Sequence, residues 1–271
     1  MHGWNSLFDA ARACLDAATP EAKIELTFAA AQAFARGELA TPDDAPGPEP
    51  IRMPGRPARP ALVHPRELPK RGFGTADGRA AFVHAIAHIE FNAIDLGWDA
   101  VYRFHGLPAQ FYTDWVGVAN DEARHFSLLR ARLRELGYDY GDFDAHNGLW
   151  EMAEKTAHDG LARMALVPRV LEARGLDVTP GMIVKLRSLG DTATVAILET
   201  ILREEVAHVA AGSRWFRWYC ERDGIDPAPR FRELLGEYAR AVLYGPFNFE
   251  ARSAAGFDDE ELRMLEAFVA R

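Results

Sequence analysis

Cysteine is nearly absent from this sequence of 271 residues, which contains Cys14 and Cys220 and no other. Two cysteines so far apart make no disulfide scaffold, and the lack of a Cys-x-x-Cys pair excludes the common thiol motifs for zinc and redox chemistry. A run of about 18 apolar residues is also missing, so we expect no transmembrane helix. Asp9, Arg12 and Asp16 interrupt the apolar start of the chain, which argues against a secretion signal. We therefore expect a cytoplasmic protein.

Basic residues are outnumbered by acidic ones. Lysine and arginine number 31 against 40 aspartates and glutamates, which gives a net charge of −9. An acidic protein is a poor binder of nucleic acid or of an anionic membrane, although a local basic patch is compatible with this total. The apolar share of 48% is ordinary for a globular protein and is enough for a core.

The sequence also lacks the alternation of apolar and polar residues that marks strands, and it has no glycine-rich phosphate loop. Apolar residues recur instead at helical spacing, which predicts an all-α protein. Two helices are expected in the first forty residues, the second beginning after Thr19-Pro20 and ending at Gly37. Further helices are predicted at 79–104, 110–136, 148–174, 181–222, 228–243 and 258–270. We expect Pro168 to interrupt the segment 148–174, Gly175 to end it, and a break near Gly190.

Proline is concentrated in residues 42–69, which hold nine of the sixteen prolines. That density is incompatible with a helix interior or a central strand. We therefore divide the chain into an N-terminal helical extension (1–41), a proline-rich arm or linker (42–77), a four-helix bundle (78–222) and C-terminal helices packed on the bundle (223–271).

Two Glu-x-x-His motifs occur, at Glu122–His125 and Glu205–His208. Residues three apart on a helix can reach one point, and a carboxylate with an imidazole makes half of a site for a first-row transition metal. The motif alone is weak evidence, because chance gives roughly 0.7 such pairs in a chain of this composition. Both motifs, however, share a helix face with apolar residues. A carboxylate there needs a cation, a proton or a hydrogen-bond network. A buried ion pair or a hydrogen-bonded core histidine is the alternative interpretation.

Two further glutamates precede these motifs at nearly equal intervals. Glu90 lies 32 residues before Glu122, and Glu172 lies 33 residues before Glu205. An interval of this size suits a helical hairpin that returns the chain to the same level. Four glutamates and two histidines would then meet at one height of a four-helix bundle.

Glu172 has alternatives as a ligand on its own segment. Arg169 precedes it by one turn and could form a simple salt bridge with it. Other candidates on the same segment are Glu151, Glu154, His158 and Asp159.

Four neighbouring residues are candidates for hydrogen bonds to the metal ligands without binding metal themselves: Asp121, Arg124, Asp95 and His88. For Asp121 and Arg124, the alternative is a solvent-facing ion pair. A group of aromatic residues, Trp215, Phe216, Trp218 and Tyr219, is either core or the wall of a substrate pocket.

Longer motifs carry a family resemblance. These are HIEFNAIDL (88–96), FYTDWVGVANDEARHF (111–126), GLWEMAEKTAHDGLARMALVPRVLEARGLD (148–177) and EEVAHV (204–209). In them the chain resembles the DUF455 family of ferritin-like proteins over about residues 78–220. The resemblance implies a ferritin-like four-helix bundle with a dinuclear metal site at Glu90, Glu122, His125, Glu172, Glu205 and His208. It supplies no substrate.

Together these features favour a non-haem di-iron oxidoreductase that uses oxygen to oxidise or hydroxylate an unknown small molecule, with a separate electron donor. Iron is the first expectation for the two metal ions, and manganese or a mixed pair stays open. The resemblance also brings in tRNA-modifying hydroxylases, against which the net charge counts. We expect a monomer or homodimer. Two alternatives remain: iron oxidation, storage or metal buffering, and a non-catalytic helical interaction protein.

Overall fold

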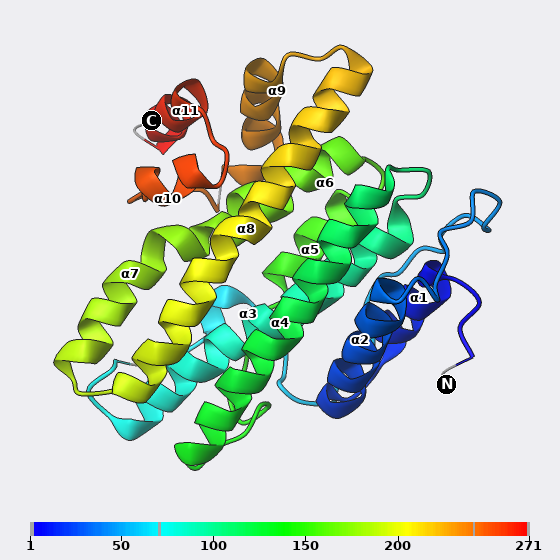
Figure 1. The fold of residues 1–271 in the computed structure, drawn as a ribbon. Coiled ribbons are helices and arrows are strands. Elements are labelled where there is room, and N and C mark those ends of the chain that lie inside the picture. Colours follow the sequence, from blue (N-terminus) through cyan, green and yellow to red (C-terminus); the bar gives the residue numbers. More distant parts are fainter. Residues whose placement is uncertain (1–2, 70–71, 241, 270–271) are drawn as a thin grey trace. The chain divides into compact units, whose positions relative to one another are not determined.

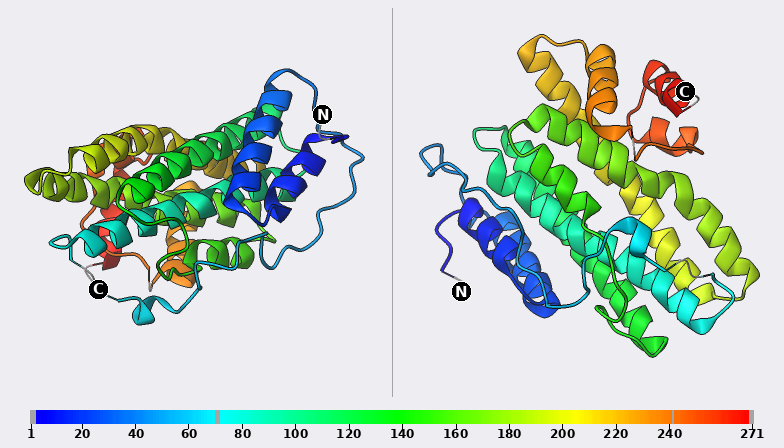
Figure 2. Two further views of the ribbon diagram at one scale, coloured as in Figure 1. Left: turned by 90° about the horizontal axis from the view of Figure 1, so that it is seen from below. Right: turned by 180° about the vertical axis from the view of Figure 1, so that it is seen from behind.

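The computed structural model describes residues 3–69, 72–240 and 242–269, and within them it confirms the predicted all-α class (Figure 1). Figure 2 shows the same helices from below and from behind. The described residues contain no strand, and their β-structure is limited to one isolated bridge between Leu62 and Ala145. None of the helices in the described ranges combines the length and apolar composition needed to cross a bilayer.

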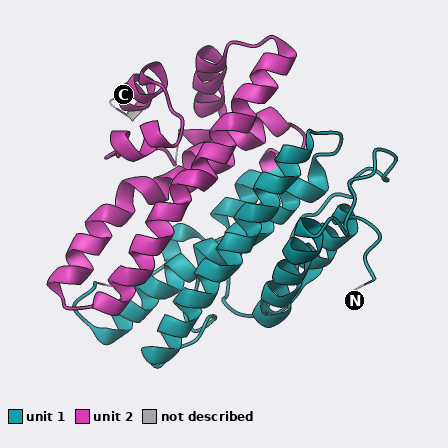
Figure 3. Ribbon diagram, in the orientation of Figure 1, with its two compact units in different colours: residues 1–154 teal, residues 155–271 magenta. Residues whose placement is uncertain are grey.

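The chain divides into two compact units, residues 1–154 and 155–271 (Figure 3). The boundary falls inside the segment 78–222, for which the sequence predicts one bundle. The four-part division of the sequence stays a prediction.

The first unit begins with helices α1 (Leu7–Asp16) and α2 (Pro20–Ala35). The predicted start of α2 is confirmed, because the Thr19 side chain accepts a hydrogen bond from the Ala22 amide at 3.2 Å and Pro20 occupies the first turn. Gly37 follows the end of α2 with a φ of +72°, a conformation that glycine adopts without strain.

The proline-rich segment runs over the first unit with little regular structure beyond a short 3₁₀ turn at Pro65–Glu67. Backbone hydrogen bonds hold it in place. The Gly55 amide donates to Leu15 O at 2.7 Å, and the Val63 amide donates to Ala145 O at 2.8 Å. The segment is therefore an arm bound to its own unit.

The long helices α3 (Ala76–Arg103) and α4 (Ala109–Glu135) form the centre of the first unit, and α5 (Gly148–Lys155) closes it. They run antiparallel: Phe91 meets Phe126 with ring centroids 5.1 Å apart, and six residues further along α3, Gly97 meets Ala119. The approach is closest at Gly97, where an added Cβ would lie 2.9 Å from the Cβ of Ala119. This register sets Glu90 opposite the His125–Phe126 turn of α4.

A buried ion pair ties the N-terminal helices to α3. Lys23 Nζ of α2 lies 2.5 Å from Asp95 Oδ1, and both side chains are fully buried. The same ammonium donates to the backbone carbonyl of Cys14 at 3.0 Å. Breaking such a pair on one side leaves an uncompensated buried charge, which typically costs about 3–5 kcal/mol.

The second unit contains α6 (Gly160–Leu166), a π-helix (Val167–Glu172), α7 (Ala173–Ser188) and α8 (Thr192–Asp223). It continues through α9 (Pro227–Leu234), a second π-helix (Leu235–Ala239), α10 (Phe249–Ala254) and α11 (Asp259–Val269). The predicted break near Gly190 is confirmed, since this residue has a φ of +77° between α7 and α8. The predicted position 270 at the C-terminal end lies outside the described residues.

The prediction that Gly175 ends a helix is wrong, because α7 continues through it to Ser188. Leu176, Ile183 and Leu186 are buried along α7, and this apolar packing outweighs the helix-breaking tendency of one glycine. Pro180 also lies inside α7 and cannot donate to the carbonyl of Leu176. That carbonyl accepts a hydrogen bond from Asn248 Nδ2 at 3.2 Å instead.

The close approach of α3 and α4 gives a prediction about stability. Gly97→Ala should lower the free energy of unfolding by about 1–3 kcal/mol, because the new methyl group overpacks the contact with Ala119. Gly117→Ala is the matched control: it lies on α4 in open space, and it should gain about 0.5–1 kcal/mol from helix propensity. Urea unfolding of the two variants measures the difference. Equal effects would contradict the assigned helix contact.

Candidate metal centre

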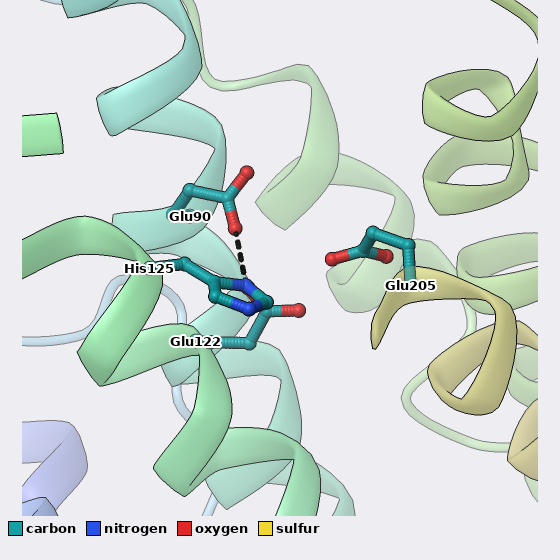
Figure 4. A group of neighbouring side chains, drawn as sticks. All are labelled: Glu90, Glu122, His125 and Glu205. Atoms are coloured by element: carbon teal, nitrogen blue, oxygen red, sulfur yellow. Dashed lines mark hydrogen bonds and ion pairs between the residues drawn. The ribbon is translucent and has the colours of Figure 1, made fainter. Parts of the chain in front are cut away.

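Three side chains of the first unit form a buried acidic and imidazole group. Glu90 comes from α3, and Glu122 and His125 lie one turn apart on α4. Their exposed fractions are 4%, 1% and 0%. His125 Nδ1 lies 3.3 Å from Glu90 Oε2 and 3.3 Å from Glu122 Oε2 (Figure 4). The ligand atoms of all three lie within 4.8 Å of one another, so the group could hold a metal ion.

The electrostatics of this group show an excess of buried acid. Burial, and then the charge of Glu122, raises the pKa of Glu90 to about 8. Burial lowers the pKa of His125, but hydrogen bonds to Glu122 and Glu90 outweigh it and raise that pKa to about 11. At neutral pH the metal-free group therefore keeps protons on Glu90 and His125. A cation that displaced them would neutralise the same carboxylates.

The second unit carries a comparable set of side chains on α8 and the π-helix. Glu205 and His208 of α8 are buried, and His208 Nδ1 lies 3.4 Å from Glu205 Oε1. Figure 4 also draws Glu205. A Cβ added to Gly212 of α8 would lie 2.3 Å from Pro168 Cγ in the π-helix. Because the two segments run antiparallel, this contact brings Glu172 level with His208.

Burial distinguishes Glu172 from the other candidates on its segment. Glu172 is buried, whereas Glu151, Glu154 and His158 are exposed. Asp159 caps α6 and accepts a hydrogen bond from the Leu161 amide at 2.8 Å. These positions favour Glu172 as the fourth glutamate of the predicted set.

The alternative of a local salt bridge between Arg169 and Glu172 does not hold, because Arg169 pairs with a different acid. Arg169 Nη2 donates to Glu261 Oε1 at 2.6 Å, and both side chains are fully buried. Sequence reasoning missed Glu261 because it lies 92 residues away. The one available signal was its place three residues after Asp258, the spacing of a helix capping box.

The structure shows the contacts of the four residues predicted to hydrogen-bond to the metal ligands. Asp121 pairs with Arg124 at 3.0 Å, and both side chains are partly exposed, as in the solvent-facing alternative. Asp95 pairs with Lys23. His88 Nδ1 lies 2.8 Å from Tyr140 Oη, and burial lowers the pKa of His88 to about 3. Support of metal ligands by these residues stays a prediction.

The aromatic group on α8 belongs mainly to the interior. Trp215, Phe216 and Tyr219 are buried, and Phe216 packs on Phe231 of α9 at a centroid distance of 5.8 Å. This position agrees with the core interpretation. A role as a pocket wall stays a prediction.

The fold and this group define an all-α protein with buried carboxylate and imidazole side chains that could bind metal. The chain belongs to the family described as "Protein of unknown function (DUF455)", whose model matches residues 16–263. It is also similar to an uncharacterized protein of Haemophilus influenzae, with 51% identity over 214 residues that cover 76% of this chain and 74% of the relative. No solved structure matches the chain.

The raised pKa values predict that the metal-free protein loses stability as the pH rises. The folded state keeps the Glu90 proton between pH 4.5 and about 8, where the unfolded chain has released it. His125 acts in the same direction between pH 6.5 and about 11. This stability is therefore fully present below the lower values and is lost as the pH rises. Melting temperatures measured with chelator between about pH 5 and 9 should show the fall.

Glu90→Gln cannot titrate, so we expect a shallower dependence of melting temperature on pH in this variant. Glu151→Gln, at an exposed position, is the matched control and should keep the wild-type dependence. An unchanged slope in Glu90→Gln would contradict the assigned pKa of Glu90.

Proposed function

We propose that this protein binds two metal ions in a ferritin-like dinuclear centre and acts as an oxygen-dependent oxidoreductase. The proposed ligands are Glu90, Glu122 and His125 of the first unit and Glu172, Glu205 and His208 of the second. The observation that carries the proposal is the buried group of Glu90, Glu122 and His125, where two carboxylates share one imidazole.

The equivalence of the two units supports a pair of metals. Each unit has one Glu-x-x-His motif on a long helix and a further buried glutamate on the antiparallel segment packed beside it. A glutamate from each of two helices with a Glu-x-x-His motif from each of two others is the ligand set of dinuclear carboxylate proteins in helical bundles. Under this proposal the two sets meet around the metals.

The donor atoms fit iron or manganese. Carboxylate oxygen and neutral imidazole nitrogen suit both metals, and thiolates, which select softer ions, are missing from the group. The bound metals would supply redox chemistry toward dioxygen. On binding, Glu90 and His125 release the protons that they hold in the metal-free group. Buried Ala119, Phe126 and Leu129 exclude water around the α4 motif.

The substrate and its electron donor enter this proposal only by class. The chain carries a net charge of −9, which disfavours a polynucleotide and favours a small organic molecule as the group to be oxidised. We propose a monomer or homodimer as the working state. Iron storage uses the same ligands, so the experiments below are designed to separate it from catalysis.

Removing one ligand from either unit should abolish normal metal loading. Wild-type protein is incubated anaerobically with an excess of iron(II) or manganese(II) and then desalted. It should retain about two metals per chain. Glu122→Gln and Glu205→Gln should each weaken binding at least about 100-fold, since loss of a residue that merely supports a ligand already costs about 10–100-fold. Elemental analysis after desalting gives the metal content.

Glu151→Gln is the control, because it makes the same change at an exposed glutamate of α5, a helix that carries no proposed ligand. Loss of metal in Glu122→Gln with full loading in Glu205→Gln would contradict a centre shared by the two units. If the wild-type protein binds no metal, and neither iron nor manganese raises its melting temperature, the result would favour the non-catalytic alternative.

Oxygen consumption distinguishes an enzyme from an iron store. Iron-loaded protein supplied with a reductant should consume oxygen repeatedly while its iron content stays at about two per chain. The Glu122→Gln variant should not. An oxygen electrode and elemental analysis of the same sample provide both readings. Iron uptake far beyond the ligand number, in a hollow assembly on a sizing column, would contradict the enzyme and favour storage.

A further inference from the structure

A buried arginine lies one turn before the proposed ligand Glu172. Arg169 belongs to the π-helix, and its side chain has no exposed surface. Its Nη2 donates to Glu261 Oε1 at 2.6 Å and its Nε donates to Ser213 Oγ at 3.2 Å. Three phenylalanine rings enclose the guanidinium at 4.3, 4.4 and 4.7 Å: Phe257, Phe231 and Phe216. Any displacement of Arg169 would leave a buried charge unpaired.

Glu261, the partner of Arg169, is itself held firmly at the start of α11. Its Oε2 accepts from the Asp258 amide at 3.1 Å, and the Glu261 amide donates to Asp258 Oδ1 at 2.9 Å. This reciprocal pair is a capping box, which fixes the first turn of a helix. Arg217 Nη2 of α8 adds a third contact, at 2.9 Å from Glu261 Oε2.

A second buried arginine lies in the C-terminal segment, by which we mean α10 and α11 (residues 249–269), and it binds the chain after Glu172 in the sequence. Arg252 of α10 donates to both carboxylate oxygens of Asp177, at 2.9 and 2.7 Å, and these side chains are fully buried. Arg252 Nη1 also donates to the backbone carbonyl of Arg169 at 3.3 Å. The C-terminal segment therefore grips the backbone three residues before Glu172 and a side chain five residues after it.

The local helix geometry makes these contacts matter for the direction of Glu172. A π-helix is wider than an α-helix, and π turns are rare and short. If residues 167–172 returned to α-helical geometry, Glu172 would rotate about the helix axis. The Pro168–Gly212 contact fixes one side of the π-helix against α8. The contacts of Arg169 with Ser213 and Glu261, and of Arg252 with the Arg169 carbonyl, hold the next residue of the π-helix.

We propose that Arg169, clamped by Glu261 and Arg252 of the C-terminal segment, is a positioning residue that holds the π-helix so that Glu172 binds metal. This role rests on the proposed dinuclear centre. If Arg169 has this role, α10 and α11 determine how tightly the metal ion bound by Glu172 is held.

The test removes the charges of Arg169 and Glu261 together, because removing one of them would leave the other charge buried without its partner. In Arg169→Met/Glu261→Met, Arg217 keeps access to solvent and to Asp258. We expect a cooperatively folded protein in which one of the two metals binds at least about tenfold more weakly. Glu172→Gln should show the same selective loss. Titration with manganese(II), followed by electron paramagnetic resonance, measures each affinity.

Hydrogen exchange gives a reading that needs no metal. The backbone amides of residues 169–172 should exchange at least about tenfold faster in the metal-free double variant, since the clamp no longer holds the π-helix closed. The matched control is Arg187→Met/Glu199→Met, which removes an exposed ion pair between α7 and α8 in the same unit. The control should change neither metal affinity nor exchange.

The outcomes separate the two proposals. A wild-type protein with two metals, and a folded double variant that matches it in affinity, would overturn the role of Arg169 alone. A wild-type protein that binds no metal would overturn the dinuclear centre and this role with it. If the double variant does not fold, Arg169→Lys is tested in the same way, because it keeps the charge but loses the planar fork that donates to Glu261 and Ser213 together. Wild-type affinity and exchange in that variant would overturn the proposal.

Discussion

Carboxylates buried without water need a positive partner, and this need governs the site on α3 and α4. Glu90 and Glu122 lie in an interior where an isolated negative charge costs several kcal/mol or more. Burial and the charge of Glu122 raise the pKa of Glu90, and hydrogen bonds to both glutamates raise the pKa of His125 against the effect of burial, so each group keeps a proton. The arrangement stabilises positive charge at one point, and a divalent cation satisfies the same requirement with coordinate bonds.

Such a point exists only if the helices hold their register. A slide of one residue along α4 would turn His125 away from Glu90 by about 100°. Gly97 favours this register, because its missing side chain leaves room for Ala119 of α4, and the Phe91–Phe126 contact lies at the level of the site itself. Asp95 lies about 140° around α3 from Glu90, so the ion pair with Lys23 holds the helix from a different side. Opposing faces of one helix thus carry the site and its anchor.

Local signals explain what could be predicted from the sequence. The Thr19 cap, the Gly190 break and the inward faces of Glu122 and His125 each depend on a few neighbouring residues, and the structure has them as expected. The end assigned to Gly175 failed because long-range packing of α7 decides there. The sequence offered Glu172 as an alternative partner of Arg169, whereas its partner in the structure, Glu261, lies on a distant helix. Pairing across 92 residues leaves no periodic trace in a single sequence.

The two units show the same anchoring device behind their candidate ligands. In the first, Lys23 and Asp95 are 72 residues apart, and in the second, Arg169 and Glu261 are 92 apart. Apolar faces tolerate a small slide, because one methyl group replaces another at little cost. A buried ion pair does not, since a slide leaves both charges without partners. Metal ligands must be placed to within about 0.5 Å, a precision that apolar packing alone does not guarantee. We therefore interpret these pairs as determinants of register more than of stability, placed on the helical segments where an error of register would separate the ligands.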